Sequence, residues 1–194
     1  MLYVILDSSA TYLTVAIASK TKVIESVSYE AWQCQSEKMI PELQKLLEKY
    51  HYSSKDISRV IVGVGPGSYT GIRIAITTAK ILALSLKVPV YPVSSLHILK
   101  DGSKPTITLM NARSNRSFFA VYQGNKVIEE DQTMTNDKVN EYISSHPEYI
   151  VKGELKYLGR EDNVGNIARE AFSLIKYLEK AEDPLAVKPI YMRG

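Results

Sequence analysis

The stretch Gly65-Pro66-Gly67-Ser68-Tyr69-Thr70-Gly71-Ile72-Arg73 decides the fold, because it follows the apolar run Val60–Val64 and opens a long apolar-striped segment. A strand, a glycine turn and a helix start therefore lie in one segment. Glycines allow positive φ and close backbone approach, and the hydroxyls of Ser68 and Thr70 can accept hydrogen bonds from the first unpaired N–H groups of the helix. Arg73 falls in the first helical turn, where the helix dipole disfavours a cation, so we expect a partner near it.

The spacing of this glycine corner differs from that of the common phosphate-binding loops. A P-loop has Lys and then Ser or Thr directly after its last glycine, whereas Gly71 is followed by Ile72 and Arg73. A dinucleotide fingerprint has two residues between its second and third glycines, whereas three separate Gly67 from Gly71. The other interpretation of the corner is a structural turn that lets a helix pack closely on its strand.

Composition indicates a globular protein of a reducing compartment. With 194 residues and 45% apolar content, the chain can bury a substantial core. Cys34 is the single cysteine, which excludes an internal disulfide, and the three histidines are scattered, so no zinc-ligand cluster is recognisable. We therefore expect no bound metal.

The N-terminus and the charge distribution predict location and partners. The first apolar run ends at Asp7 and has no basic residues before it, and no later run approaches the ~18 residues that a membrane span needs. We expect a cytoplasmic protein with no membrane contact. The net charge of 24 − 21 = +3 is spread along the chain, which predicts weak direct affinity for nucleic acid and an RNA connection only through partners.

Periodicity predicts the same order of elements twice. In the first half, strands are expected at 2–6, 13–19, 21–28, 60–64 and 88–93, and helices from about 37, capped by Ser36, and from 70 to about 86. Beyond a boundary at 103–105, strands are expected at 106–110, 117–123, 126–131 and 149–152, and helices at 136–145, capped by Thr135, and 164–180.

Two β-β-β-α-β-α units side by side describe the lobes of the actin, sugar kinase and Hsp70 superfamily. The expected fold class is therefore α/β and actin-like, with an N-terminal lobe of residues 1–104 and a C-terminal lobe of residues 105–194.

ATP-using members of that superfamily wrap the phosphates with an Asp and a glycine-rich turn after the first strand. The equivalent here is Asp7-Ser8-Ser9, which has the carboxylate and hydroxyls but no glycine, and the matching second-lobe turn 111–116 also lacks glycine. Backbone approach to a phosphate is easiest where no Cβ intrudes. We therefore interpret Asp7, Ser8 and Ser9 as a vestigial phosphate loop that does not support ATP hydrolysis.

Four motifs, in this order, resemble the TsaB (YeaZ) family: Asp7-Ser8-Ser9, the corner Gly65–Arg73, Asn111-Ala112-Arg113 and the ending Pro189–Arg193. The resemblance spans nearly the whole chain, and the corner is its most specific element. It implies a bacterial, cytoplasmic, actin-like protein required for N6-threonylcarbamoyladenosine (t6A) at position 37 of tRNA. It also implies a non-catalytic relative of the enzyme TsaD that pairs with TsaD through first-lobe helices, with the ATPase TsaE joining the assembly.

The resemblance implies no cofactor on this chain alone, with ATP or ADP at the complex with TsaD and TsaE, and tRNA contacted indirectly through that complex. In TsaD, two histidines bind the metal. By resemblance, Ser95 and Leu99 stand at these positions, and a leucine cannot ligate a metal. His97 is then expected to be a surface or core residue. Asn111 in place of the family's Asp and Gln35 in place of its His remove titratable groups.

The helix 70–86 carries two apolar faces. The face that most simply packs on the sheet has Ile72, Ala75, Ile76, Ala79, Leu82, Ala83 and Leu86. The opposite face, here called the outer face, has Arg73, Ile74, Thr77, Lys80, Ile81 and Leu84. Exposed apolar side chains mark an interface, so we expect TsaD, or a second copy of this chain as a homodimer, to dock there. Arg73 can meet a carboxylate across the interface or a partner within its own chain.

Three functional hypotheses follow. The leading one is a non-catalytic scaffold subunit that activates TsaD, with no catalytic residues of its own. The second is a stand-alone nucleotide-handling enzyme of the actin-like type, which the glycine-free turns disfavour. The third is a glycoprotease-like peptidase, for which Ser68 lacks the Gly-x-Ser-x-Gly setting and a placed histidine.

Two points stay open on the sequence alone. Residues 188–194 either pack back on the first lobe or stay free of it. Lys100, Lys104, Arg113 and Arg116 either contribute to an RNA surface or are simply solvated.

Overall fold

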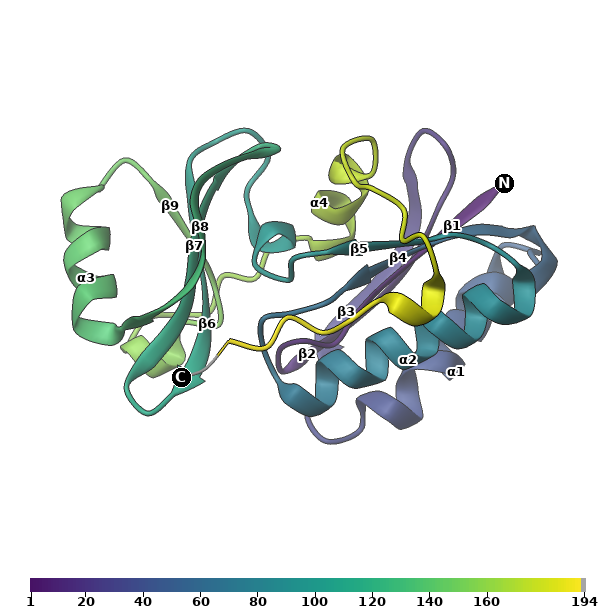
Figure 1. The fold of residues 1–194 in the computed structure, drawn as a ribbon, viewed down its shortest axis with the longest axis horizontal. Helices are drawn as coiled ribbons and strands as arrows, with labels where there is room; N and C mark the ends of the chain where they lie inside the picture. Colours follow the sequence, from purple (N-terminus) through teal and green to yellow (C-terminus); the bar gives the residue numbers. More distant parts are fainter. Residues whose placement is uncertain (193–194) are drawn as a thin grey trace.

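The computed structural model describes residues 1–192, in which two sheets lie side by side (Figure 1). The first sheet has the order β3-β2-β1-β4-β5. Its strands are β1 (Leu2–Asp7), β2 (Tyr12–Ala18), β3 (Val23–Glu30), β4 (Ile57–Gly63) and β5 (Val90–Val93). Strand β1 pairs antiparallel with β2 and parallel with β4. Strand β1 thus has its hairpin partner β2 on one side and its parallel partner β4, reached by a crossover connection, on the other.

The second sheet repeats this arrangement with the order β8-β7-β6-β9. Its strands are β6 (Thr106–Arg113), β7 (Arg116–Gln123), β8 (Lys126–Thr135) and β9 (Ile150–Gly153). Strand β6 pairs antiparallel with β7 and parallel with β9, as β1 does with β2 and β4. The repeat of topology is the one that periodicity predicted, and the actin-like α/β fold class is confirmed.

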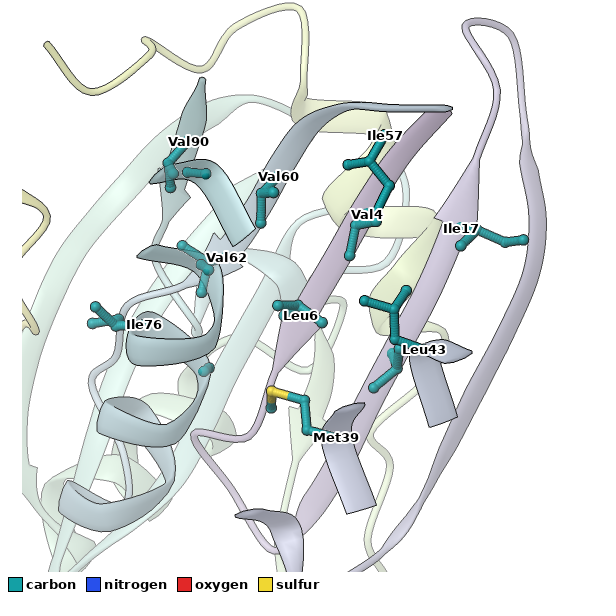
Figure 2. Close-up of a cluster of buried hydrophobic side chains, with 14 of the residues drawn as sticks. Val4, Leu6, Ile17, Met39, Leu43, Ile57, Val60, Val62, Ile76 and Val90 are labelled. Carbon is teal, nitrogen blue, oxygen red and sulfur yellow. The ribbon is translucent and has the colours of Figure 1, made fainter. Parts of the chain in front are cut away.

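Alternation along β1 divides the first lobe into two cores, because successive strand residues face opposite sides of a sheet. Val4 and Leu6 face α1 (Gln35–Lys49) and α2 (Tyr69–Leu86), where they join a cluster that includes Met39, Leu43 and Ile76 (Figure 2). Tyr3 and Ile5 face the other side and join α4 (Ile167–Leu174).

The first helix starts earlier than expected. Helix α1 begins at Gln35 after Cys34, whose side chain makes no capping bond, so the predicted cap Ser36 lies inside the helix and that prediction is wrong. Helix α3 (Asn136–Ser145) has the predicted bounds and covers the second sheet through Val139 and Ile143.

Helix α4 (Ile167–Leu174) comes from the second half of the chain but packs on the first sheet, against β1, β2 and β3. It is shorter than the expected 164–180. Asn166 accepts a hydrogen bond from Arg169 N at 2.9 Å and caps the helix start, and after Leu174 the chain turns toward the edge of the first sheet, where Ala181 N donates to Val90 O at 2.8 Å.

The chain after α4 returns along the first lobe, in yellow in Figure 1. Val187 is buried in the first-lobe core, and Ile190 N donates to Val64 O at 2.7 Å. Residues 181–190 therefore pack back on the first lobe. Arg193, part of the terminal motif, lies outside the described residues. The division into lobes at residues 104 and 105 stays a prediction.

Within residues 1–192, α2 is long and apolar enough, by length and composition, to cross a membrane. The sequence-based expectation that no run approaches that length is therefore wrong for α2. One face of the helix is nevertheless buried in the first-lobe core, through Ile72, Ala75, Ile76, Ala79 and Ala83.

Candidate functional site

The glycine corner brings the start of α2 against the β1–β2 turn. Gly67 has a φ of +151°, and a Cβ there would overlap the carbonyl oxygen of Ser9. A Cβ at Gly71 would overlap the carbonyl oxygen of Ser8. These glycines are required because two backbones approach closely.

Hydrogen bonds fasten the same contact. Ser68 N donates to Ser9 O at 2.6 Å, and Ser8 Oγ donates to Gly71 O at 2.8 Å. Ser68 Oγ accepts from Gly71 N at 3.3 Å, so Ser68 caps α2 as predicted. Thr70 is exposed on the surface of the corner. Hydrogen bonds from backbone and hydroxyl groups thus hold the glycine corner against the β1–β2 turn.

Asp7 is buried beneath the corner at the end of β1. Its carboxylate accepts hydrogen bonds from Ser95 Oγ at 3.1 Å and from Ser9 Oγ at 3.0 Å. The Ser95 hydroxyl in turn accepts one from Gly65 N at 3.0 Å. Burial raises the pKa of Asp7 from 3.8 to about 6, because the loss of hydration outweighs the hydrogen bonds to the charged form. Asp7 thereby joins β1, the corner and the segment after β5.

The turn Asp7-Ser8-Ser9 does not fit a phosphate group. All three residues are buried, and their side chains are engaged within the protein by the bonds described above. A phosphate loop presents donors that face the ligand, whereas the hydroxyl donors of this turn face the interior.

A cleft of about 600 Å³ separates this turn from its second-lobe counterpart. Trp32 and the glycine corner line it on the first-lobe side. Across it, Thr11 N donates to Glu154 Oε1 at 2.6 Å and joins the lobes. The β6–β7 turn is exposed, and its residues 113–115 all have left-handed φ without being glycine.

The two departures from the family pattern make structural hydrogen bonds. Gln35 is buried, and its Nε2 donates to Ala10 O at 3.0 Å, which ties the start of α1 to the β1–β2 turn. Asn111 Oδ1 accepts from Arg113 N at 2.8 Å and braces the exposed turn. An amide performs both roles without titrating.

Ser95 and Leu99, which the resemblance aligns with the metal ligands of TsaD, do not fit a metal. The Ser95 hydroxyl is taken by the bonds described above, and Leu99 is buried in the core. The His97 ring stacks on Tyr122 with centroids 3.9 Å apart, and its Nε2 lies 3.0 Å from Gly124 O. Burial lowers the pKa of His97. His97 is therefore a packing residue between the lobes.

The outer face of α2 is partly available. Ile81 and Leu84 are 59% and 49% exposed, and Arg73 and Thr77 are also exposed. Ile74 is half-buried and packs against the first-lobe core, so its side chain is less available than the outer-face pattern predicted. Ile81 is the better probe of this surface.

Arg73 finds its partner within the chain. Its guanidinium donates to the Tyr69 hydroxyl at 2.6 Å and lies 5.3 Å from the centre of that ring. Tyr69 also stacks on Tyr191, with ring centroids 5.0 Å apart. Further along α2, Lys80 Nζ donates to Leu185 O at 2.9 Å. Two predicted interface residues thus contact groups of their own chain: Arg73 binds Tyr69, which stacks on Tyr191, and Lys80 binds the backbone at Leu185.

Three exposed side chains next to the outer face were missed as candidate interface residues by sequence reasoning, namely Tyr69, Leu185 and Tyr191. Tyr69 and Tyr191 had been noted only as members of motifs. Leu185 gave no signal, because its place beside α2 depends on the return of the chain after α4.

Comparison with known protein families identifies the family of this chain. Residues 27–168 match a family model described as TsaD, tRNA N6-adenosine threonylcarbamoyltransferase. The chain belongs to this family. Within the family it is similar to TsaB and YeaZ proteins, as the motifs predicted.

The chain is 33% identical over 129 residues to the tRNA threonylcarbamoyladenosine biosynthesis protein TsaB of Buchnera aphidicola subsp. Schizaphis graminum, covering 63% of this chain and 61% of that protein. It is 33% identical over 122 residues to TsaB of Bacillus subtilis, covering 61% and 53%. The chain therefore matches between half and two thirds of the length of these relatives.

Solved structures agree on the fold. YeaZ from Pseudomonas aeruginosa superposes with a TM-score of 0.77 at 21% identity, over 98% of this chain and 99% of that one. A protein from the same organism, described as similar to peptidase YeaZ, gives 0.85 at 21% identity, over 99% of each chain. The family assigned from the sequence and the fold shared with these solved structures are therefore consistent with each other.

Proposed function

We propose that this chain is a non-catalytic subunit that pairs with TsaD in t6A formation on tRNA, in the cytoplasm. The names of its TsaB relatives support the tRNA-modification role. The exposed Ile81 and Leu84 on the outer face of α2 carry the pairing, because exposed apolar clusters of this kind mark interfaces. Burying each side chain would contribute about 1.5–3 kcal/mol to association.

The proposed absence of a catalytic role is supported by the β1–β2 turn, whose buried polar side chains are bonded within the protein. Asp7 and its two serine neighbours are occupied by internal hydrogen bonds, and a helix cap is the observed role of Ser68. In this proposal, ATP or ADP binds where TsaD and TsaE meet this chain, and tRNA is held mainly by the complex. A second copy of the chain would compete with TsaD for the same outer face.

The test is reconstitution of tRNA modification from purified TsaD, TsaE, threonylcarbamoyl-adenylate and unmodified tRNA, with and without this chain. We expect product only when the chain is present. Ile81→Glu places a charge beside Leu84 on the outer face and should lower both TsaD binding and product. Val127→Glu, at a similarly exposed apolar side chain on β8, is the matched control and should leave both unchanged.

Three results would contradict the proposal. TsaD could form product at the same rate without the chain. The chain alone could hydrolyse ATP or cleave a protein substrate, which would indicate an independent enzyme. Ile81→Glu could bind TsaD as tightly as the wild type, which would remove the outer face from the interface.

A further inference from the structure

A second surface lies on the side of the first sheet opposite α2. It is a groove of about 660 Å³ between α4, the loop of residues 100–104 and the β7–β8 turn. Because α4 covers the face of β1 that carries Tyr3 and Ile5, whereas α2 covers the face that carries Val4 and Leu6, the groove and the outer face of α2 are separated by the sheet.

The acidic side chains of the groove are already neutralised. Glu170 is buried and pairs with the buried Lys100, and it also accepts a hydrogen bond from Arg169 Nε at 3.0 Å. Asp101 pairs with Lys152 at 3.3 Å. Lys100 is therefore not free to contact RNA, and its role as a candidate RNA contact is corrected to that of a buried counter-ion for Glu170.

Positive charge remains on the walls of the groove. Lys104 and Lys176 are exposed and have no ion-pair partner within residues 1–192. Beside them, Tyr177 is 52% exposed, and Lys176 Nζ lies 4.8 Å from the centre of its ring. Ammonium groups without an ion-pair partner attract phosphates, and an exposed aromatic ring can stack on an unpaired base. The two together suit a single-stranded nucleic acid, in which phosphates alternate with unpaired bases.

We propose that this groove binds a single-stranded segment of RNA, with Lys104 and Lys176 at phosphates and Tyr177 beneath an unpaired base. The choice of RNA as the anion rests on the proposed function. The sheet between the groove and the outer face of α2 lets the chain hold RNA and a protein partner at the same time. The chain then contributes directly to substrate binding, in addition to any contact through partners.

The experiment measures binding of a fluorescently labelled, unmodified tRNA anticodon stem–loop to this chain alone, by anisotropy, as a function of salt. We expect Lys104→Gln with Lys176→Gln to weaken binding about tenfold and to lower the slope of log affinity against log salt by about 1.4, two contacts of ~0.7 each. Tyr177→Ala should weaken binding at least about fivefold and leave that slope unchanged.

The matched control is Lys55→Gln with Lys138→Gln, which removes two exposed lysines from other surfaces of the chain. An equal loss of binding in this control would show a diffuse charge effect and overturn the proposal. An unchanged affinity in Tyr177→Ala would also overturn it, as would equally tight binding of a polyglutamate peptide, which would assign the groove to an acidic protein. TsaD plays no part in this assay, so its outcome is independent of the test of pairing.

Discussion

The two hairpin turns that face each other across the cleft occupy equivalent places in their sheets, yet they differ in burial, in hydrogen-bond partners and in backbone conformation. The β1–β2 turn is buried, the Ser8 hydroxyl donates to Gly71 O in the glycine corner, and the Asp7 carboxylate accepts from the hydroxyls of Ser9 and Ser95. The β6–β7 turn is exposed and holds residues 113–115 in left-handed backbone conformations. Equal topology therefore does not produce equal turns.

The difference follows from the helix that comes after the fourth strand of each lobe. Helix α2 starts at the glycine corner and presses its first turn on the β1–β2 turn. Its counterpart α4 leaves the second lobe and packs on the first sheet. The β6–β7 turn is instead met by the first residue of α3, since Asn136 N donates to Asn115 O at 3.0 Å, and it stays exposed. The turn is thus a buried structural joint in one lobe and an exposed surface loop in the other.

The largest effect is expected where two backbones meet. Gly71→Ala should lower the free energy of unfolding by about 4 kcal/mol, because the new Cβ overlaps the Ser8 carbonyl and a backbone cannot turn aside as a side chain can. Gly159→Ala is the control, since Gly159 has a φ of +72° with open space around it and should cost only about 1 kcal/mol. Urea denaturation gives both values, and equal costs would contradict the close approach.

The second effect concerns pH. Because the pKa of Asp7 is raised from 3.8 to about 6, between these values the folded state holds a proton that the unfolded state has released. The free energy of unfolding should therefore fall as pH rises through this window, by about 3 kcal/mol. Asp7→Asn should remove this slope. Asn111→Asp in the exposed turn should add none, and a slope that persists in Asp7→Asn would assign it to another group.

The smallest effect separates a bonded hydroxyl from a solvated one. Ser8→Ala removes the donor to Gly71 O and should cost about 1 kcal/mol. Ser114→Ala, in the exposed turn, should change the free energy of unfolding by less than about 0.5 kcal/mol. Thermal denaturation of the two variants side by side tests this, and similar midpoints would remove the distinction between the turns.

Local signals predicted the elements well. The repeat of strands and helices, the cap Ser68 and the bounds of α3 depend on neighbouring residues, so they could be inferred from spacing. The destination of α4 could not. An apolar stripe on a helix indicates which side is buried but not which sheet it meets, and the ion pair of Lys100 with Glu170 joins residues 70 positions apart.

The same limit applies to the candidate site. The outer face of α2 was predictable from its 3.6-residue period, and Ile81 and Leu84 are exposed as that pattern requires. The half-burial of Ile74 and the contact between Lys80 and Leu185 were not, because both depend on neighbours that are distant in sequence. Prediction of the β1–β2 turn identified the missing glycine but not the burial of Asp7.

The return of residues 181–190 to the first lobe also governs how the molecule is made. Val187 belongs to the core around β1, and Ala181 bonds the edge strand β5. A ribosome therefore releases strands β1 to β5, then the entire second sheet, before it supplies the last pieces of the first core. During that interval the backbone groups at the edge of β5 and the apolar side chains that Val187 later covers are open to solvent, which exposes the partly synthesised chain to aggregation.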